Sequence, residues 1–292
     1  MMDLLLEPRA FRLLEGLRIA PRKSQPGRVR GERLTRRAGL SIEFADYRNY
    51  AEGDDLRHLD WNVLARLDSP VMRTYRDEED LAVHVLLDDS PSMAFGEPEK
   101  GRAARDLAAA FGYVGLMGGD AVTPVRLGRR EPPLSALRGR ASYGRYAAWL
   151  GQPTSEDSPI GLSASLRAFA ASKARTGVAI VLSDGLDPEA PNALRTLVGR
   201  GHEVWAVQIL SDLDLDPDLE GDLRLVDGEG GAPTEITANS LTLRVYRENL
   251  TRHCAAFSDA AKRGGGRYTL YRTGTSLDIF LKDVLKREGW LR

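Results

Sequence analysis

Two near-continuous apolar runs, each ending at an acidic residue, constrain the fold of this chain more than any other feature. The first run, residues 82–88 (AVHVLLD), is rich in branched side chains and ends at Asp88. The second run, residues 177–185 (GVAIVLSDG), repeats this design and ends in Ser-Asp-Gly. Strands that are apolar on both faces are typical of parallel sheets covered by helices on both sides. The two runs therefore predict two inner strands of such a sheet.

Strand-like and helix-like segments alternate from residue 82 to the end of the chain. Residues 202–210 are a third buried run, and residues 119–128 form a strand that Pro124 places at an edge, because proline cannot donate to a sheet ladder. A hairpin (223–237) and one more strand (267–272) follow. The segments with helical character are 99–117, 143–150, 160–173, 190–199, 239–263 and 275–287. This alternation predicts an open, mostly parallel α/β sheet of Rossmann-like type, with helices on both faces.

Residues 1–79 lack this alternation, and we interpret them as a smaller segment that packs on a main domain formed by residues 80–292. Residues 2–18 predict an amphipathic helix. Residues 21–40 are basic and poorly periodic, which is typical of an exposed arm.

The overall composition argues against several classes of partner. The net charge of −1 provides no general attraction to nucleic acid or membrane, and the basic arm lacks the interleaved aromatics of single-strand binders. Cys254 is the single cysteine, so no internal disulfide can form, and a reducing compartment fits best. No apolar run approaches the ~18 residues of a transmembrane helix. We therefore expect a cytoplasmic protein with neither a nucleic-acid partner nor a membrane span.

The segment LLDDSPSM, residues 86–93, carries the clearest chemical motif. Asp88, Ser90 and Ser92 alternate in the loop that follows the first apolar run, so three oxygen-bearing side chains can turn toward one point. A carboxylate with two hydroxyls suits Mg²⁺ or Mn²⁺. Asp184 ends the second run, and the carboxyl ends of parallel strands meet at one edge of the sheet. The sequence predicts a divalent-metal site there, with Asp184 beside the ion.

The same motif has a purely structural interpretation. Ser90 and Ser92 could cap the following helix, and Asp88 could accept hydrogen bonds from amides of its own loop. The context of a buried strand, with a second strand ending in Ser-Asp-Gly, favours the metal site.

Residues 43–66 (EFADYRNYAEGDDLRHLDWNVLAR) carry three further motifs in order: Tyr-Arg-x-Tyr, Gly-Asp-x-x-Arg and Asp-Trp-x-x-x-Ala-Arg. Their residues are Tyr47, Arg48, Tyr50, Gly53, Asp54, Arg57, Asp60, Trp61, Ala65 and Arg66, with Asp55 as an additional acid. Together with the Asp-x-Ser-x-Ser motif, they resemble the bacterial family called domain of unknown function 58. The metal motif itself is similar to the metal-ion-dependent adhesion site of von Willebrand factor type A domains.

The resemblance implies a non-enzymatic adaptor that acts with a MoxR-type AAA+ ATPase in assembling or maturing other proteins. It also implies that a bound Mg²⁺ is completed by an acidic residue of the partner. One departure concerns a threonine that type A domains usually supply before a central helix, because Ile160 stands at that position here. Ser158 or Thr154 could replace it.

The signature segment has two physical interpretations. Its acidic and basic residues alternate closely, so they could pair in a polar network that fixes the segment to the sheet, with Trp61 as an apolar anchor. Alternatively, the segment is a docking face for a partner.

Two other functions remain open at this stage. A divalent ion at the strand ends could activate water for phosphoester hydrolysis, with Asp89 and Asp187 as the nearby candidate bases. Alternatively, Ile160 marks a decayed metal site, and the protein is a structural scaffold.

Two short patterns carry less weight. Residues 96–103 (GEPEKGRA) imitate a phosphate-binding loop, but Arg102 and Ala103 replace its lysine and hydroxyl residues. The acidic stretch from Asp212 to Glu220 has Pro217 where a calcium loop needs glycine, which indicates a solvated loop.

Overall fold

The computed structural model describes residues 6, 8–22, 43–51, 53–76, 80–129, 133–152, 160–226 and 232–292. They form two compact units, one combining Met1–Lys23 with Leu81–Arg292 and the other spanning Ser24–Asp80. The N-terminal helix therefore belongs to the larger unit, whereas the sequence analysis grouped it with the signature segment. Each unit is described by itself below.

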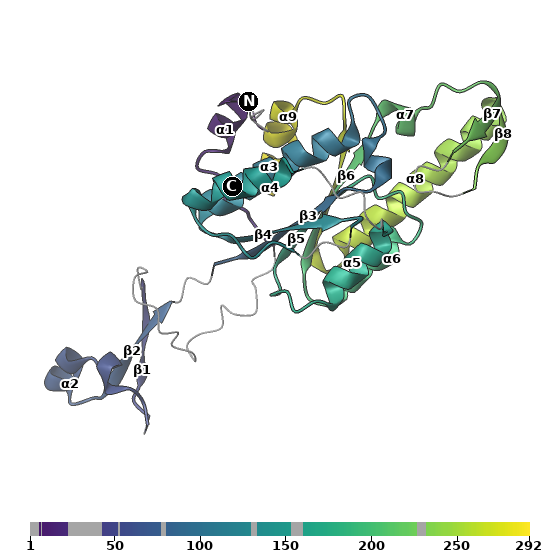
Figure 1. The fold of residues 1–292 in the computed structure, drawn as a ribbon. Coiled ribbons are helices and arrows are strands. Elements are labelled where there is room, and N and C mark those ends of the chain that lie inside the picture. Colours follow the sequence, from purple (N-terminus) through teal and green to yellow (C-terminus); the bar gives the residue numbers. More distant parts are fainter. Residues whose placement is uncertain are drawn as a thin grey trace. The chain divides into compact units, whose positions relative to one another are not determined.

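The larger unit is built on five parallel strands in the order β4-β3-β5-β6-β9, flanked by helices (Figure 1). Every predicted strand is present. The bounds are β3 (Ala82–Asp88), β4 (Ala121–Leu127), β5 (Val178–Ser183), β6 (Glu203–Leu210) and β9 (Arg267–Arg272). The α/β class and the mostly parallel sheet expected from the sequence are thus confirmed. Pro124 lies in β4, at one edge of the sheet, as its missing N–H requires.

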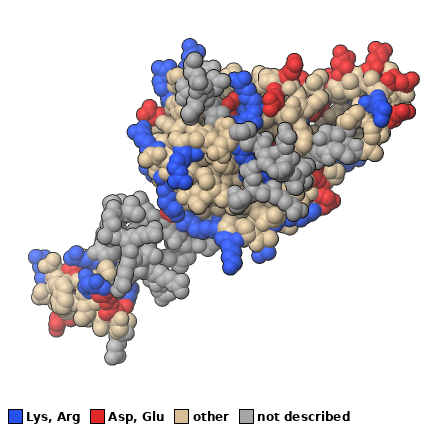
Figure 2. Space-filling view, viewed as in Figure 1, with Lys and Arg blue, Asp and Glu red and all other residues tan. Residues whose placement is uncertain are grey.

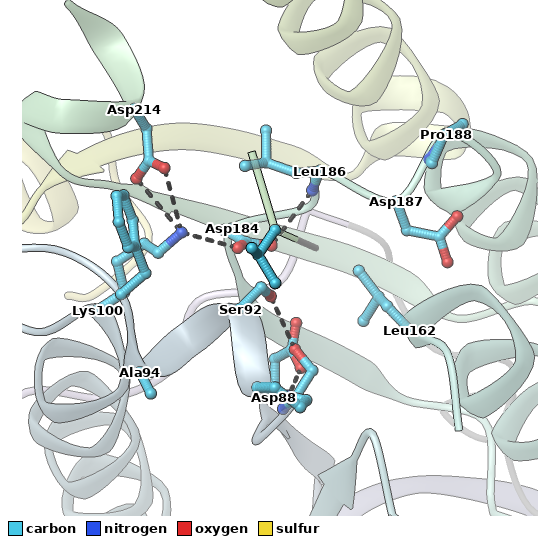
Figure 3. Close-up of a pocket in the computed structure, with 14 residues that line it drawn as sticks. Asp88, Ser92, Ala94, Lys100, Leu162, Asp184, Leu186, Asp187, Pro188 and Asp214 are labelled. Carbon is cyan, nitrogen blue, oxygen red and sulfur yellow. Dashed lines mark hydrogen bonds and ion pairs between the residues drawn. The ribbon is translucent and has the colours of Figure 1, made fainter. Parts of the chain in front are cut away.

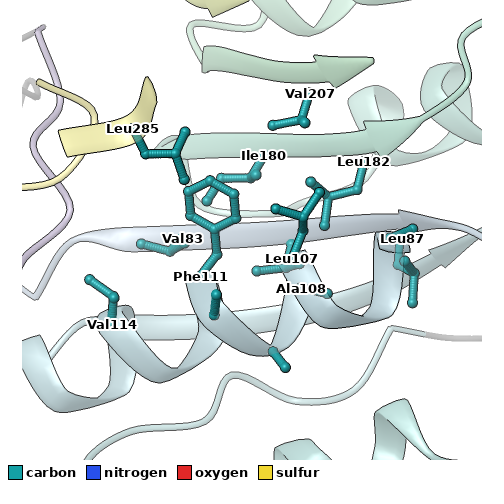
Figure 4. Packing of buried hydrophobic residues seen from close by; sticks show 14 of the residues in the cluster. Val83, Leu87, Leu107, Ala108, Phe111, Val114, Ile180, Leu182, Val207 and Leu285 are labelled. Carbon is teal, nitrogen blue, oxygen red and sulfur yellow. The ribbon is translucent and has the colours of Figure 1, made fainter. Parts of the chain in front are cut away.

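One face of the sheet is covered by α3 (Lys100–Gly118), α4 (Tyr143–Leu150), α1 (Pro8–Leu14) and the C-terminal helical segment. Val83 and Leu87 of β3 point to this face and meet Leu107, Phe111 and Val114 of α3 in one buried cluster (Figure 4). Burying each such side chain contributes roughly 1.5–3 kcal/mol. This layer is therefore a main source of stability.

The opposite face is covered by α5 (Leu162–Ala171), α6 (Ala190–Gly199) and α8 (Ser240–Lys262). Leu86 of β3 and Val181 of β5 belong to this second cluster with Leu194 and Phe257. Successive side chains of a strand point to opposite faces, so strands buried on both sides must be apolar throughout. This requirement explains the two uninterrupted runs in the sequence.

The order of the strands reverses at β3. The chain passes from β3 to β4 on one side and later returns to pair β5 on the other side of β3. In open α/β sheets, such a switch point leaves a crevice at the carboxyl ends of the two central strands. Asp88 ends β3 and Asp184 directly follows β5, so both lie at this crevice.

A short helix and a hairpin follow β6. They are α7 (Asp212–Leu215), β7 (Gly221–Leu225) and β8 (Thr234–Ala238), with β7 and β8 antiparallel. The hairpin predicted at 223–237 and the long helix predicted at 239–263 are therefore confirmed within a few residues.

The ends of the larger unit differ from expectation. The N-terminal helix ends earlier than the predicted residue 18, because its described part, α1, stops at Leu14 and the chain turns at Gly16 with a φ of +78°. The helix predicted at 275–287 consists of one α-helical turn, α9 (Leu277–Ile279), followed by a π-helical segment, Phe280–Lys286.

The smaller unit contains two strands that the sequence analysis did not predict. β1 (Glu43–Asn49) pairs antiparallel with β2 (Val71–Arg76), and a 3₁₀ turn (Leu56–His58) and α2 (Trp61–Leu67) lie between them in sequence. In the described residues of both units, no helix has the length and apolar composition to cross a membrane.

Candidate functional site

A cavity of about 650 Å³ opens at the switch point of the larger unit (Figure 3). It combines acidic and hydroxyl side chains at its base with apolar side chains around them. Its lining residues are Asp88, Ser90, Pro91, Ser92, Ala94, Phe95, Lys100, Leu162, Asp184, Leu186, Asp187, Pro188, Asp214 and Val226. All four residues predicted from the sequence as the core of a metal site, at 88, 90, 92 and 184, therefore line one cavity.

Asp88 lies at the base of this cavity and is only 1% exposed. Its Oδ1 accepts a hydrogen bond from the Ser90 N–H at 3.0 Å, and its Oδ2 accepts one from the Ser183 hydroxyl. Burial and the neighbouring Asp184 carboxylate raise the pKa of Asp88 to about 6, although the bonds from Ser183 and Ser90 oppose this. Burial is the larger of the two causes that raise this pKa.

The hydroxyls of Ser90 and Ser92 lie 3.0 Å apart, Oγ to Oγ. Ser90 precedes the 3₁₀ turn Pro91–Ala94, but its side chain makes no capping bond to that turn. The structural interpretation is therefore correct for Asp88, which does bind a loop amide, and does not hold for Ser90. The two hydroxyls remain directed at each other beside the Asp88 carboxylate.

Asp184 is held on both of its oxygens. Oδ1 accepts the Leu186 N–H at 3.2 Å, and Oδ2 accepts from Lys100 Nζ at 2.9 Å. Because of these bonds, Asp184 is better placed to orient a water bound to an ion than to coordinate the ion with a free carboxylate. Its auxiliary role beside an ion, expected from the sequence, stays a prediction.

Lys100 is one residue of the cavity that was not predicted from the sequence. Its side chain is buried, and Nζ lies 2.9 Å from Asp184 and 3.3 Å from Asp214, as the dashed lines of Figure 3 show. It stands at the first position of α3, inside the stretch that imitates a phosphate-binding loop. That stretch is the sequence signal available for Lys100, although its likeness to a nucleotide-binding motif points to a different role.

Asp214 was also missed as a site residue. It is the third residue of α7 and forms a capping box with Ser211, in which Asp214 Oδ2 accepts the Ser211 N–H at 2.8 Å. In sequence it belongs to the acidic stretch that begins at Asp212, where a solvated loop was expected. The structure instead buries Asp214 against Lys100, while Asp212 and Asp216 form ion pairs with Arg272 and Arg247.

The charges of the buried groups can be counted. Three carboxylates (Asp88, Asp184 and Asp214) and one ammonium (Lys100) leave a charge of −2 when all are ionised. One divalent cation would balance that charge, and carboxylate and hydroxyl oxygens are the donors that Mg²⁺ and Mn²⁺ prefer. No described group of three or more His, Cys, Asp and Glu side chains is placed to hold a metal. Ion binding here would therefore depend on the serine hydroxyls.

The proposed third hydroxyl is not identified. Ser158 and Thr154 lie outside the described residues, so their placement stays a prediction. Ile160 is described, and its N–H donates to the Gly128 carbonyl at 3.1 Å. Ile160 does not line the cavity, whereas Leu162, two residues later, lines it with an apolar side chain.

The two candidate bases of the hydrolase alternative are both engaged. Asp89 forms an ion pair with Arg126, and it is not among the residues that line the cavity. Asp187 lines the cavity, but its oxygens accept the backbone N–H groups of Ser163 and Glu189, at 2.9 and 2.8 Å. Each of the two carboxylates is thus already bound to a neighbouring group of the described structure.

The signature residues form a paired network in the smaller unit. Arg48 donates two hydrogen bonds of 2.6 Å to Asp54, and Arg57 pairs with Asp55 at 2.6 Å. These arginines lower the pKa of each carboxyl to about 2. Gly53 has a φ of +97°, a conformation that favours glycine, in the turn that brings Asp54 to Arg48.

Asp60 accepts hydrogen bonds from several elements of the smaller unit. Its Oδ1 caps α2 by accepting the N–H groups of Asn62 and Val63, and its Oδ2 accepts from Tyr47 and Arg73 at 2.9 and 2.8 Å. The predicted pairing of acidic and basic residues is therefore present within this unit, while its role in fixing the segment to the main sheet stays a prediction. Four signature residues remain outside this pairing, on the surface: Tyr50, Trp61, Ala65 and Arg66. Trp61 is 61% exposed, so its role as an apolar anchor stays a prediction.

The described geometry defines a class: an α/β protein with a five-stranded parallel sheet and an acidic, hydroxyl-bearing cavity at its switch point. The family model described as protein of unknown function DUF58 matches residues 46–256. The chain belongs to this family, as its motifs indicated.

Several relatives can be matched over most of the length of this chain. Uncharacterized proteins of Mycobacterium tuberculosis (strains H37Rv and CDC 1551) and Mycobacterium bovis are each 29% identical to it over 272 residues. The matched region covers 89% of this chain and 83% of each relative.

Solved structures show more distant likeness. The conserved hypothetical protein BatB of Bacteroides thetaiotaomicron and an aerotolerance-related membrane protein of Bacteroides fragilis are each 16% identical, with TM-scores of 0.44 and 0.43. Each match covers 71% of this chain and 98% of the other. An uncharacterized membrane-spanning protein of Vibrio fischeri, 15% identical, has a TM-score of 0.25 and covers 72% of this chain and all of its own.

These comparisons correct one expectation. The sequence analysis expected a cytoplasmic protein, but two of the similar solved structures are described as a membrane protein and a membrane-spanning protein. Those descriptions belong to those proteins, and a cytoplasmic location is no longer assigned to this chain.

Proposed function

We propose that this protein is a non-enzymatic interaction protein with a von Willebrand factor type A-like fold and a metal-ion-dependent adhesion-type site. In this proposal, Asp88, Ser90 and Ser92 hold Mg²⁺ or Mn²⁺, and Asp184 orients the water shell. A carboxylate of a protein partner fills an open position of the ion. The observation that carries the proposal is the convergence of these four residues on one cavity at the switch point.

The electrostatics explain why a metal is needed for such a contact. The buried groups of the cavity carry a net negative charge, which would repel an acidic side chain of a partner. A divalent ion removes that repulsion and adds a strong bond to the incoming oxygen. The metal therefore makes the surface specific for carboxylates.

Resemblance to the family suggests the partner. A MoxR-type AAA+ ATPase, or an acidic client protein delivered to it, would supply the carboxylate. The hydrolase alternative gains no support from the geometry, because Asp89 pairs with Arg126 and Asp187 caps α5. We therefore keep the adaptor function as the conclusion.

The test is complex formation between the purified full chain and the purified MoxR-type ATPase of the same organism. Binding is measured by biolayer interferometry in millimolar Mg²⁺ and in EDTA. We expect binding in Mg²⁺ that is lost in EDTA and in Ser92→Ala. Asp187→Asn is the control, because Asp187 lines the cavity but caps a helix and should leave binding intact. Equal binding in Mg²⁺ and EDTA would refute metal bridging, and no binding in either would refute this partner.

A further inference from the structure

Most exposed apolar side chains of the larger unit come from one stretch of the chain, between α7 and the first turns of α8, and one of them, Val226, lines the cavity. Among its described residues, ten large apolar side chains are exposed, and seven of them lie between Leu213 and Tyr246. These seven are Leu213, Leu219, Leu225, Val226, Leu241, Val245 and Tyr246. We call them the hairpin patch. Exposed apolar side chains that cluster on a protein surface are typical of an interaction site.

The elements that carry the hairpin patch are bonded to one another. The Tyr246 hydroxyl of α8 donates to the Asp214 carbonyl of α7 at 2.7 Å. The Thr242 hydroxyl donates to the Thr237 carbonyl of β8 at 3.0 Å. A two-stranded hairpin is marginally stable alone, so these bonds to α8 hold it in place. The patch is thus part of a fixed structure.

The patch is continuous with the cavity. Val226, which is 73% exposed, lines the cavity together with Phe95, which is 52% exposed. Asp214 lines the same cavity from α7, next to Leu213 of the patch. A peptide with one side chain in the cavity would therefore contact Val226 through the peptide residues next to that side chain.

The charge around the patch indicates which side chains a partner would carry. Figure 2 shows acidic side chains gathered at the end of the larger unit that carries β7 and β8. Asp218, Glu220 and Glu235 are exposed and form no ion pair with any described residue, although Arg224 lies on the same hairpin. Such a surface repels nucleic-acid phosphates and anionic lipid headgroups, and it attracts Lys and Arg.

We infer that the hairpin patch is the docking surface for a protein segment in which one carboxylate is flanked by apolar and basic side chains. The carboxylate enters the cavity, the apolar side chains cover Val226 and Leu241, and the basic side chains face Asp218, Glu220 and Glu235. This inference rests on the proposed metal-bridging function for the carboxylate, but its apolar and basic contacts stand on the patch itself.

The test selects peptides from a random library displayed on phage, using the full chain in millimolar Mg²⁺ as the target. The strongest peptide is then synthesised, and its affinity is measured by fluorescence anisotropy. We expect it to combine an acidic residue with apolar and basic residues. The double variant Val226→Ser, Leu241→Ser should weaken it by about tenfold or more. Ile279→Ser, an exposed apolar residue of α9 outside the patch, is the matched control and should change nothing.

The outcomes separate the two proposals. Affinity that falls in the double variant and also in EDTA supports both. Affinity that falls in the double variant but persists in EDTA supports the patch and refutes metal bridging. Affinity that falls only in EDTA refutes the patch, and so does a library that yields no peptide above background. A double variant that changes the molar mass of the chain in light scattering would refute it as well, since the patch would then join two copies.

Discussion

Lys100 connects the candidate metal residues to the rest of the molecule. It is one of the few fully buried cations of the described chain, and it contacts Asp184, which follows β5, and Asp214 of α7. The side chain of a buried lysine loses its hydration, so it is tolerated only where carboxylates compensate. The same contact keeps Asp184 oriented beside the Asp88 loop.

Replacing Lys100 by methionine should therefore destabilise the metal-free protein strongly. We expect Lys100→Met to lower the free energy of unfolding in EDTA by about 3–5 kcal/mol, because two buried carboxylates lose their partner. Millimolar Mg²⁺ should restore part of this loss, and urea unfolding measures both. Lys173→Met, at an exposed lysine, is the control and should cost little. A Lys100→Met protein as stable as the wild type in EDTA would contradict this account.

Asp106, on α3, provides a test that does not involve the site. Burial raises its pKa to about 6, against the effect of Arg102 and Arg105. Because this folded-state value lies above the unfolded value of 3.8, the ionised carboxylate disfavours folding. The cost is present above pH 6 and disappears as the pH falls toward 3.8.

We therefore expect Asp106→Asn to be more stable than the wild type by about 1–2 kcal/mol near neutral pH, after partial solvent exposure is considered. The difference should shrink as the pH falls below 6 and vanish at about pH 3, below both pKa values, where the carboxyl is neutral in the folded and the unfolded chain. Thermal unfolding across this range measures it. A constant difference at every pH would show that the effect is not electrostatic.

At the residue level, the carboxylates of the cavity were easier to predict from the sequence than the side chains that bind them. Asp88 and Asp184 could be predicted because each ends an apolar run, and parallel topology brings such ends together. Lys100 could not, because the burial of a lysine depends on Asp214, which is 114 residues away in the sequence. Ser183 was visible in the Ser-Asp-Gly motif, but only the structure shows its hydroxyl bound to Asp88.

Among the elements, the end of β4 packs closely against the Asp-x-Ser-x-Ser loop. Gly128 has a φ of +82°, and a Cβ added there would lie 2.9 Å from the Ser90 backbone nitrogen. The N–H of Asp89 also donates to the Leu127 carbonyl at 3.1 Å. The position of the loop therefore depends on a glycine in a neighbouring strand end.

A methyl group at this position should disturb both stability and the site. We expect Gly128→Ala to lower the free energy of unfolding by about 2–3 kcal/mol, from backbone strain and the clash with Ser90. It should also weaken Mg²⁺ binding. Gly119→Ala is the control, because Gly119 has a φ of +87° with open space around it, so it carries strain without the clash. Equal effects of the two substitutions, by urea unfolding and metal titration, would contradict the close packing.

The central elements were predictable, and those of the smaller unit were not. Strands buried on both faces leave uninterrupted apolar runs, so β3, β5 and β6 are visible without the structure. β1 (EFADYRN) and β2 (VMRTYR) mix charged and apolar residues, because a two-stranded sheet has little to bury. Their pairing depends on polar contacts such as that between Asp60 and Arg73, which no periodicity predicts.

In the larger unit as a whole, residues near both ends of the sequence pack together in the layer that covers one face of the sheet. The N–H of Arg18 donates to the Arg292 carbonyl at 2.6 Å, and Ile19 forms a bridge with Leu291. Trp290 is 1% exposed, and its ring centre lies 5.3 Å from that of Trp205 in β6. Residues from both ends of the sequence therefore cover part of this face of the sheet.

This packing predicts a large effect of a substitution far from the cavity. We expect Trp290→Ala to lower the free energy of unfolding by about 3–5 kcal/mol, through lost burial and the space left behind. Arg267 stacks on both indoles and would lose one of them. Urea unfolding measures the loss, and Mg²⁺ affinity at low denaturant should stay unchanged. A loss below about 1 kcal/mol would mean that the end is loosely packed.

The measurement that tests the central claim most directly is an isothermal titration of Mg²⁺ and Mn²⁺ into the full chain, with Asp88→Asn and Ser92→Ala alongside. The account predicts saturable binding of one ion at up to millimolar concentration in the wild type. It predicts loss of that binding in both variants, while Asp187→Asn, which alters a helix cap of the same cavity, still binds. Circular dichroism confirms that each variant is folded. Identical titrations of the wild type and the folded Ser92→Ala variant would contradict the metal site.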